Sequence, residues 1–89
     1  MLHKEIVVKG MVHGVYFRAT AKSVAASMGL KGQVKNLPDG HVWIAAEGPA
    51  TAMKEFIDWC RIGPSGAKVS GLDITEGPLQ HYTDFSILH

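Results

Sequence analysis

The sequence has little cysteine, little net charge and no long apolar run, and each absence excludes a class of protein. Its one cysteine, Cys60, cannot form an internal disulfide, which favours a reducing compartment. Nine basic and eight acidic residues give a net charge of +1, so broad electrostatic binding to nucleic acid or membrane is not expected. No apolar run approaches the roughly 20 residues of a membrane helix, and the N-terminus lacks a signal-peptide layout. We therefore expect a cytoplasmic protein that binds neither nucleic acid nor membrane.

Patterns for metal binding and for several domains are missing as well. The histidines show no paired ligand spacing, so surface or terminal positions are expected for them, and no metal or other cofactor is implied. These are His3, His13, His41, His81 and His89. Without a linker, repeat or charge block, residues 1–89 are expected to form one domain, and nothing in the chain demands more than a monomer.

The first third of the sequence has patterns that predict a strand and then a helix. Between Lys4 and Val12 apolar residues alternate, with Ile6, Val8 and Val12 on one face, which predicts a strand with one buried face. Apolar residues then recur at helical spacing, and Gly29 supplies a stop. This helical stripe consists of Phe17, Ala21, Val24, Ala25 and Met28.

The remaining two thirds predict a hairpin, a second helix and extended ends. Residues 30–48 form the hairpin around the turn Pro38-Asp39-Gly40. A helix is expected to open at Pro49, which suits a first helical position, and to end at Gly63-Pro64. Its apolar stripe is Met53, Phe56, Ile57 and Cys60, so a buried, unreactive thiol is expected. Residues 67–77 and 81–88 supply the last extended segments.

The element order is β-α-β-β-α-β, with room for a short extra strand near the C-terminus. This order predicts an α+β, ferredoxin-like two-layer sandwich, with two helices on one face of an antiparallel sheet. The first two strands are then parallel and separated by the third, so their C-terminal ends lie at one edge. Arg18 follows the first strand, whereas Asn36 ends the second and shares the parity of core-facing Val34. We expect Arg18 and Asn36 to converge on the helix side.

The loop GMVHGVYFR, Gly10 to Arg18, has the features of an anion site. Gly14 permits a sharp turn, and successive amides before a helix form a nest at the positive end of the dipole. A cation is mildly unfavourable there, so Arg18, a planar two-pronged donor, indicates a bound dianion such as phosphate. For an isolated Gly-x-x-x-Arg, a plain turn and a solvated arginine would be the simpler interpretation.

A longer pattern resembles the acylphosphatase family. GMVHGVYFR, GLKGQVKNLPDGHVWIAAEG and GPSGAKV follow one another in the order and spacing of that family and cover nearly the entire chain. The resemblance implies hydrolysis of acyl phosphates to carboxylate and inorganic phosphate, with phosphate or sulfate as product-like ligands. It places phosphate binding on Arg18 and water orientation on Asn36. The phosphate cradle would comprise backbone groups of His13, Gly14, Val15, Tyr16, Phe17 and Arg18.

The sequence departs from the family's usual residues at His13, Gln33 and Ala21, where Gln, Trp and Thr are common. These departures bear on rate and substrate preference, and titration of His13 in the cradle would tune phosphate binding near neutral pH. The reaction itself is plausible from the residues alone. Because a carboxylate is already a good leaving group, charge stabilisation and a water held in line are sufficient. An arginine, a ring of amides and a carboxamide supply both without a metal.

The alternative is a binding module without catalysis, because ferredoxin-like sandwiches also serve as RNA-binding and small-ligand regulatory domains. An RNA-binding strand would be basic and rich in aromatic residues, whereas HVWIAAEG has one aromatic residue and no Arg or Lys. A small-ligand module would not need Arg18 and Asn36 to converge. We expect Trp43 and Trp59 to pack in the core or at its rim.

Overall fold

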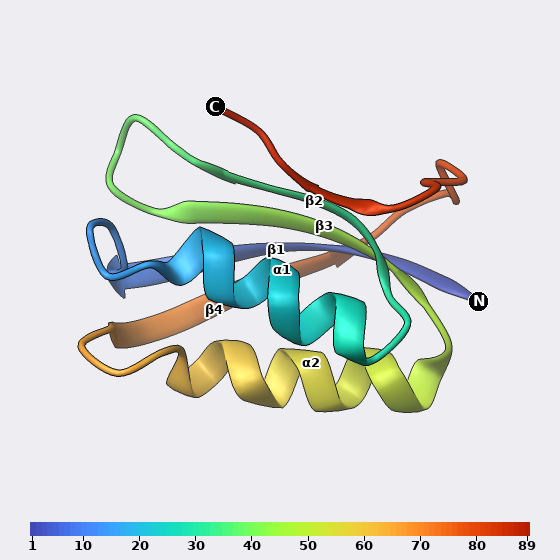
Figure 1. The fold of residues 1–89 in the computed structure, drawn as a ribbon, viewed down its shortest axis with the longest axis horizontal. Helices are drawn as coiled ribbons and strands as arrows, with labels where there is room; N and C mark the ends of the chain where they lie inside the picture. Colours follow the sequence, from blue (N-terminus) through green and yellow to red (C-terminus); the bar gives the residue numbers. More distant parts are fainter.

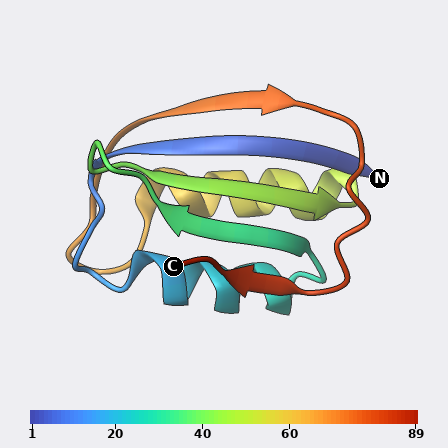
Figure 2. The same ribbon diagram turned by 90° about the horizontal axis from the view of Figure 1, so that it is seen from above.

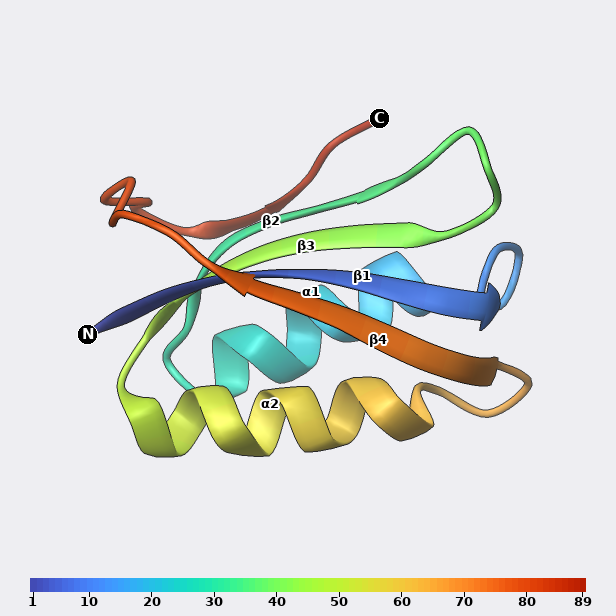
Figure 3. The same cartoon turned by 180° about the vertical axis from the view of Figure 1, so that it is seen from behind.

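The computed structural model describes all 89 residues and contains five strands and two helices. In chain order these are β1 (Leu2–Met11), α1 (Phe17–Ser27), β2 (Lys31–Asn36), β3 (Val42–Gly48), α2 (Ala50–Ile62), β4 (Lys68–Glu76) and β5 (Phe85–Ile87). Both helices lie on one face of the sheet (Figure 1), and the opposite face carries no helix (Figure 3). The predicted ferredoxin-like sandwich, including its short extra strand, is confirmed.

The strand order is β4-β1-β3-β2-β5. β3 pairs antiparallel with both β1 and β2, so β1 and β2 run parallel on either side of it, as expected. Figure 2 shows β1, β2 and β5 running in one direction, which places their C-terminal ends together at one end of the sheet. The start of α1 lies at this same end.

Two details differ from the sequence-based expectations. β5 pairs parallel with β2, Val34 opposite Ile87, so the sheet expected to be antiparallel has one parallel pair at its edge. The chain turns back at the far end of the sheet after β4, and it therefore returns in the direction of β2. α2 begins at Ala50, and Pro49 is its N-cap, because a ψ of 152° keeps Pro49 extended. Its carbonyl still accepts a hydrogen bond from the Met53 amide at 2.9 Å.

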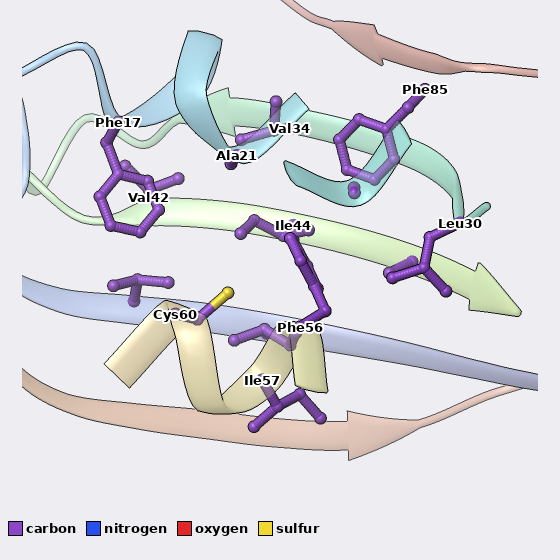
Figure 4. Packing of buried hydrophobic residues seen from close by; sticks show 14 of the residues in the cluster. Phe17, Ala21, Leu30, Val34, Val42, Ile44, Phe56, Ile57, Cys60 and Phe85 are labelled. Atoms are coloured by element: carbon purple, nitrogen blue, oxygen red, sulfur yellow. The ribbon is translucent and has the colours of Figure 1, made fainter. Parts of the chain in front are cut away.

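The core lies between the sheet and the two helices (Figure 4). The inward residues of the predicted strands, such as Ile6 and Val8, are fully buried. Trp59 packs against Phe56 and Phe17, with ring centroids 6.0 and 5.4 Å away, as expected of a packing residue. Cys60 is buried in this core, and burial raises its pKa to about 12, which keeps the thiol protonated.

A polar cluster is buried at the opposite end of the sheet from the start of α1. The Glu47 carboxylate lies 2.8 Å from His3 Nδ1 and accepts hydrogen bonds from the amides of Gln80 and Tyr82. Glu5 contacts the other ring nitrogen of His3 at 3.2 Å. These contacts fasten residues 77–84, which link β4 to β5, to the sheet, and we call this segment the strap.

Electrostatics in this cluster favour the charged forms of both partners. Burial by itself would lower the pKa of His3, but hydrogen bonds and charge interactions with Glu47 and Glu5 raise it above its ordinary value. Burial would likewise raise the pKa of Glu47, yet hydrogen bonds from Gln80, His3 and Tyr82 hold it below its ordinary value. The strap is therefore anchored by two of its backbone amides, which donate to the Glu47 carboxylate that also pairs with His3.

Candidate active site

The loop between β1 and α1 turns on two residues with left-handed backbone. Gly14 has φ of 72°, as its predicted turning role requires, and Tyr16, the N-cap of α1, has φ of 60°. No side chain caps the helix, so the first amides of α1 are left for other partners. The Tyr16 carbonyl is the first acceptor of the helix, and it accepts hydrogen bonds from the backbone amide and the side-chain hydroxyl of Thr20. The helix start is therefore an open set of amide donors.

Arg18 is the second residue of α1 and is half-buried. Its guanidinium forms no ion pair and no hydrogen bond within the protein, so all its donors remain available. The preceding residue, Phe17, is only 2% exposed and anchors the helix start in the core. Burial of a phenylalanine side chain contributes about 2–3 kcal/mol, which holds the backbone of Arg18 in place.

Asn36 is the last residue of β2, opposite Val42 in β3. Its carboxamide forms no hydrogen bond within the protein. The following turn is held by other groups, since the Leu37 amide donates to the His41 carbonyl at 2.8 Å and the His41 amide donates to Asp39 Oδ1 at 3.0 Å. The turn therefore does not depend on the Asn36 side chain.

Arg18 and Asn36 line the same cavity, which has a volume of about 390 Å³. The convergence expected from strand order is thus present in the structure. Its lining residues come from the C-terminal ends of β1, β2 and β5 and from the start of α1. Figure 2 shows that these strand ends and the helix start lie at one end of the sheet. Its nine lining residues are Val12, Gly14, Tyr16, Phe17, Arg18, Ala19, Asn36, Ile87 and His89.

His13 and Val15 belong to the loop but do not line this cavity. His13 is exposed, and its Nε2 lies 2.8 Å from the carbonyl of His41, so its ring is engaged with the neighbouring turn. The hypothesis that His13 tunes phosphate binding therefore has no support from its side-chain position. Val15 packs against the edge of the hydrophobic core.

Sequence reasoning missed four cavity residues: Val12 and Ala19, which flank the predicted loop, and Ile87 and His89 near the other end of the chain. Phe85 and Ile87 alternate as a strand should, and the same alternation reaches His89. Whether these alternating residues reach the cavity depends on which strand β5 pairs with and in which direction it runs. The local sequence pattern does not specify either of these.

Two further features of the structure bear on metal binding and on membrane insertion. No group of three or more His, Cys, Asp or Glu side chains is arranged to hold a metal ion. Neither helix combines the length and the apolar character that crossing a membrane would require.

Comparisons with known proteins agree on one family. The family model described as Acylphosphatase matches residues 4–87. A curated acylphosphatase from Methylococcus capsulatus is 43% identical over 89 residues, covering 99% of this chain and 97% of the relative. One from Archaeoglobus fulgidus is 38% identical and covers both chains completely. The crystal structure of acylphosphatase from Bacillus subtilis superimposes with a TM-score of 0.97 at 39% identity, also covering both chains completely.

Proposed function

The chain belongs to the acylphosphatase family and hydrolyses acyl phosphates, and we propose that Arg18 with the loop amides holds the phosphate while Asn36 orients the attacking water. The observation that carries this proposal is the shared cavity. Two polar side chains that are far apart in sequence line it together, and neither has a partner within the protein. Such uncommitted donors are expected where a ligand completes the hydrogen bonding.

The phosphate half of the substrate fits the charge of the helix start. A phosphoryl dianion accepts hydrogen bonds from backbone amides of the loop residues that line the cavity, which are Gly14, Tyr16, Phe17 and Arg18. The positive end of the α1 dipole adds to the attraction. The Arg18 guanidinium binds two phosphoryl oxygens at once and never loses its charge. These donors also stabilise the charge that spreads over the oxygens during phosphoryl transfer.

Asn36 supplies what the anion cradle lacks, a neutral group with both a donor and an acceptor. Its carboxamide accepts a hydrogen bond from a water molecule and donates one to a phosphoryl oxygen. Holding water in line with the scissile bond lowers the entropic part of the barrier. The carboxylate leaving group departs without an acid, so the water needs orientation more than activation.

The remaining parts of the proposal concern the whole protein. We infer a single catalytic domain of residues 1–89 that works as a monomer in the cytoplasm, without a metal or other cofactor. Inorganic phosphate and sulfate, which share the tetrahedral shape of the product, are expected to bind in the cradle as competitive inhibitors.

The variant Asn36→Ala, assayed with benzoyl phosphate as substrate, tests whether Asn36 acts in the chemical step and Arg18 in phosphate binding. We expect kcat to fall about 10²–10³-fold, the loss typical of one preorganised polar group at a reacting centre. The inhibition constant of phosphate and the melting temperature should change little, because Arg18 still holds the anion and the turn is held by other groups.

Asp39→Ala is the matched control, since it removes the carboxylate that accepts the His41 amide in the adjacent turn. It should lower the melting temperature and leave kcat unchanged. The proposal for Asn36 would be wrong if the alanine variant were less stable but turned over at the native rate.

A further inference from the structure

The segment that follows β5 brings an exposed histidine, His89, to the lining of the cavity that also contains Asn36. β5 pairs with β2 in parallel, Gly32 opposite Phe85 and Val34 opposite Ile87. The Leu88 amide donates a hydrogen bond to the Val34 carbonyl at 2.8 Å, so the pairing continues past the strand. Continued for two residues beyond the last strand pair, this register leads from Val34 and Ile87 to Asn36 and His89, and both of these line the cavity.

We propose that His89 is a phosphate-binding residue whose protonated imidazole strengthens anion binding, so that affinity for the phosphoryl group increases as pH falls. This inference rests on the proposed role of the Arg18 cradle. It concerns an additional residue of that same site and its regulation by pH.

Charge balance in the cavity supports this role. Arg18 is the only permanently charged side chain that lines it, and a phosphoryl dianion carries one more negative charge than a guanidinium neutralises. An imidazolium supplies that second positive charge together with an N–H donor. Histidine is also the side chain that ordinarily changes its charge between pH 5 and 8.

Of the elements packed against this part of the cavity, α1 contributes positive charge. Arg18 lies in the cavity lining, and Lys22 follows one turn further on the same side of the helix. β2 contributes no charge on this side, because Lys35 lies on the other face of the sheet, over the Trp43 ring at 5.0 Å.

The neighbouring turn contributes no charged side chain to the cavity lining. Asp39 Oδ2 lies 3.3 Å from His41 Nδ1, and neither residue lines the cavity. In the proposed site, a bound dianion is therefore the anionic group that favours protonation of His89. By linkage, protonation of His89 must then tighten binding of the dianion by the same factor.

The test measures competitive inhibition by sulfate between pH 5.5 and 8.5, because sulfate stays a dianion over this range whereas phosphate itself titrates. In the unmodified protein, sulfate should bind about three- to tenfold more tightly at the acid end. This is the effect of one unit charge on a dianion across a few ångströms of water-like medium. In His89→Gln the affinity should become nearly independent of pH and match that of the unmodified protein at pH 8.5.

His13→Gln is the matched control, because its ring lies in the same part of the molecule but outside the cavity. It should keep the full pH dependence. The inference is overturned if sulfate affinity in the unmodified protein does not vary with pH, or if the variation survives in His89→Gln.

A third variant, Arg18→Ala, separates this inference from the function on which it rests. If Arg18→Ala abolishes sulfate inhibition while His89→Gln leaves the pH dependence intact, the proposed anion site at Arg18 is supported and the proposed role of His89 is wrong. If sulfate inhibition is unaffected by Arg18→Ala, the cradle itself is wrong. Melting temperatures of all variants verify that each remains folded.

Discussion

At the scale of single residues, the proposed phosphate contact of Arg18 depends on the geometry of its side chain as much as on its charge. The residue extends from a helix start that is anchored by buried Phe17, so its backbone cannot move to compensate for a different side chain. A guanidinium spans two phosphoryl oxygens, whereas a lysine ammonium at the same backbone position contacts them as a point charge.

We therefore expect Arg18→Lys to be severely impaired. Loss of a close charged contact costs roughly 2–5 kcal/mol, which corresponds to a decrease in kcat/KM of about two to four decades. Steady-state kinetics with benzoyl phosphate measure the effect. Arg61→Lys, in the last turn of α2, is the control and should be nearly neutral. Near-native efficiency of the Arg18 variant would show that Arg18 does not clamp the phosphate.

At the scale of elements, β5 depends on the strap that leads into it. The strap is anchored by Glu47, which binds His3 and two strap amides in a buried site. Because β5 carries Ile87 and His89 to the cavity, this anchor at one end of the sheet positions residues at the other.

Glu47→Gln should lower the free energy of unfolding by about 3 kcal/mol, because it removes the buried anionic partner of His3 and leaves only the half-exposed Glu5. Glu76→Gln makes the same chemical change at an exposed pair with Lys4, 3.5 Å long, and should cost less than about 1 kcal/mol. Urea denaturation measures the free energy of unfolding of both variants. Equal effects of the two substitutions would contradict the anchoring role of Glu47.

The buried pair of His3 and Glu47 also predicts how the stability of the protein depends on pH. Because folding raises the pKa of His3, its protonated form stabilises the folded protein. This stabilisation is complete at pH values below the ordinary pKa of 6.5 and is lost as the pH rises through the raised pKa. Because folding lowers the pKa of Glu47, its ionised form also stabilises the folded protein. This stabilisation is complete at pH values above the ordinary pKa of 4.5 and is lost as the pH falls through the lowered pKa. The contribution of the pair is therefore largest between these two values, and Glu47→Gln should remove that maximum from the urea data.

At the scale of the whole molecule, the fold gathers the ends of three strands and the start of one helix around one cavity. In the proposed mechanism, charge stabilisation there comes from Arg18 and from backbone amides, which are part of the chain itself. The reaction as proposed needs no group that dialysis or chelation removes.

Hydrolysis of benzoyl phosphate should consequently survive exhaustive treatment with EDTA, with kcat unchanged. The measurement is a rate before and after chelation, followed by addition of Mg²⁺, which should produce no gain. Activity that disappears on chelation and returns with Mg²⁺ would contradict the metal-free mechanism.

Much of this architecture was predictable because its causes are local. Alternating Ile6 and Val8 specify a one-sided strand, and the turn residues Pro38-Asp39-Gly40 specify a hairpin. Element order then implied that Arg18 and Asn36 converge, because right-handed connections over one sheet leave few topologies. The start of α2 was misplaced by one residue, since the preference of proline for first helical positions does not distinguish Pro49 as N-cap from Pro49 as first residue.

The sequence by itself determined the two helices, four of the strands and the Arg18–Asn36 pair, because these follow from residue periodicity, turn chemistry and chain topology. Only the tertiary structure decided that three-residue β5 lies parallel to β2, that Glu47 and His3 are buried, and that His89 rather than His13 lines the cavity. Each of these depends on a contact between segments distant in sequence. Hydrogen bonding to a sheet edge and burial beneath a crossing strap leave no periodic signal in the residues concerned.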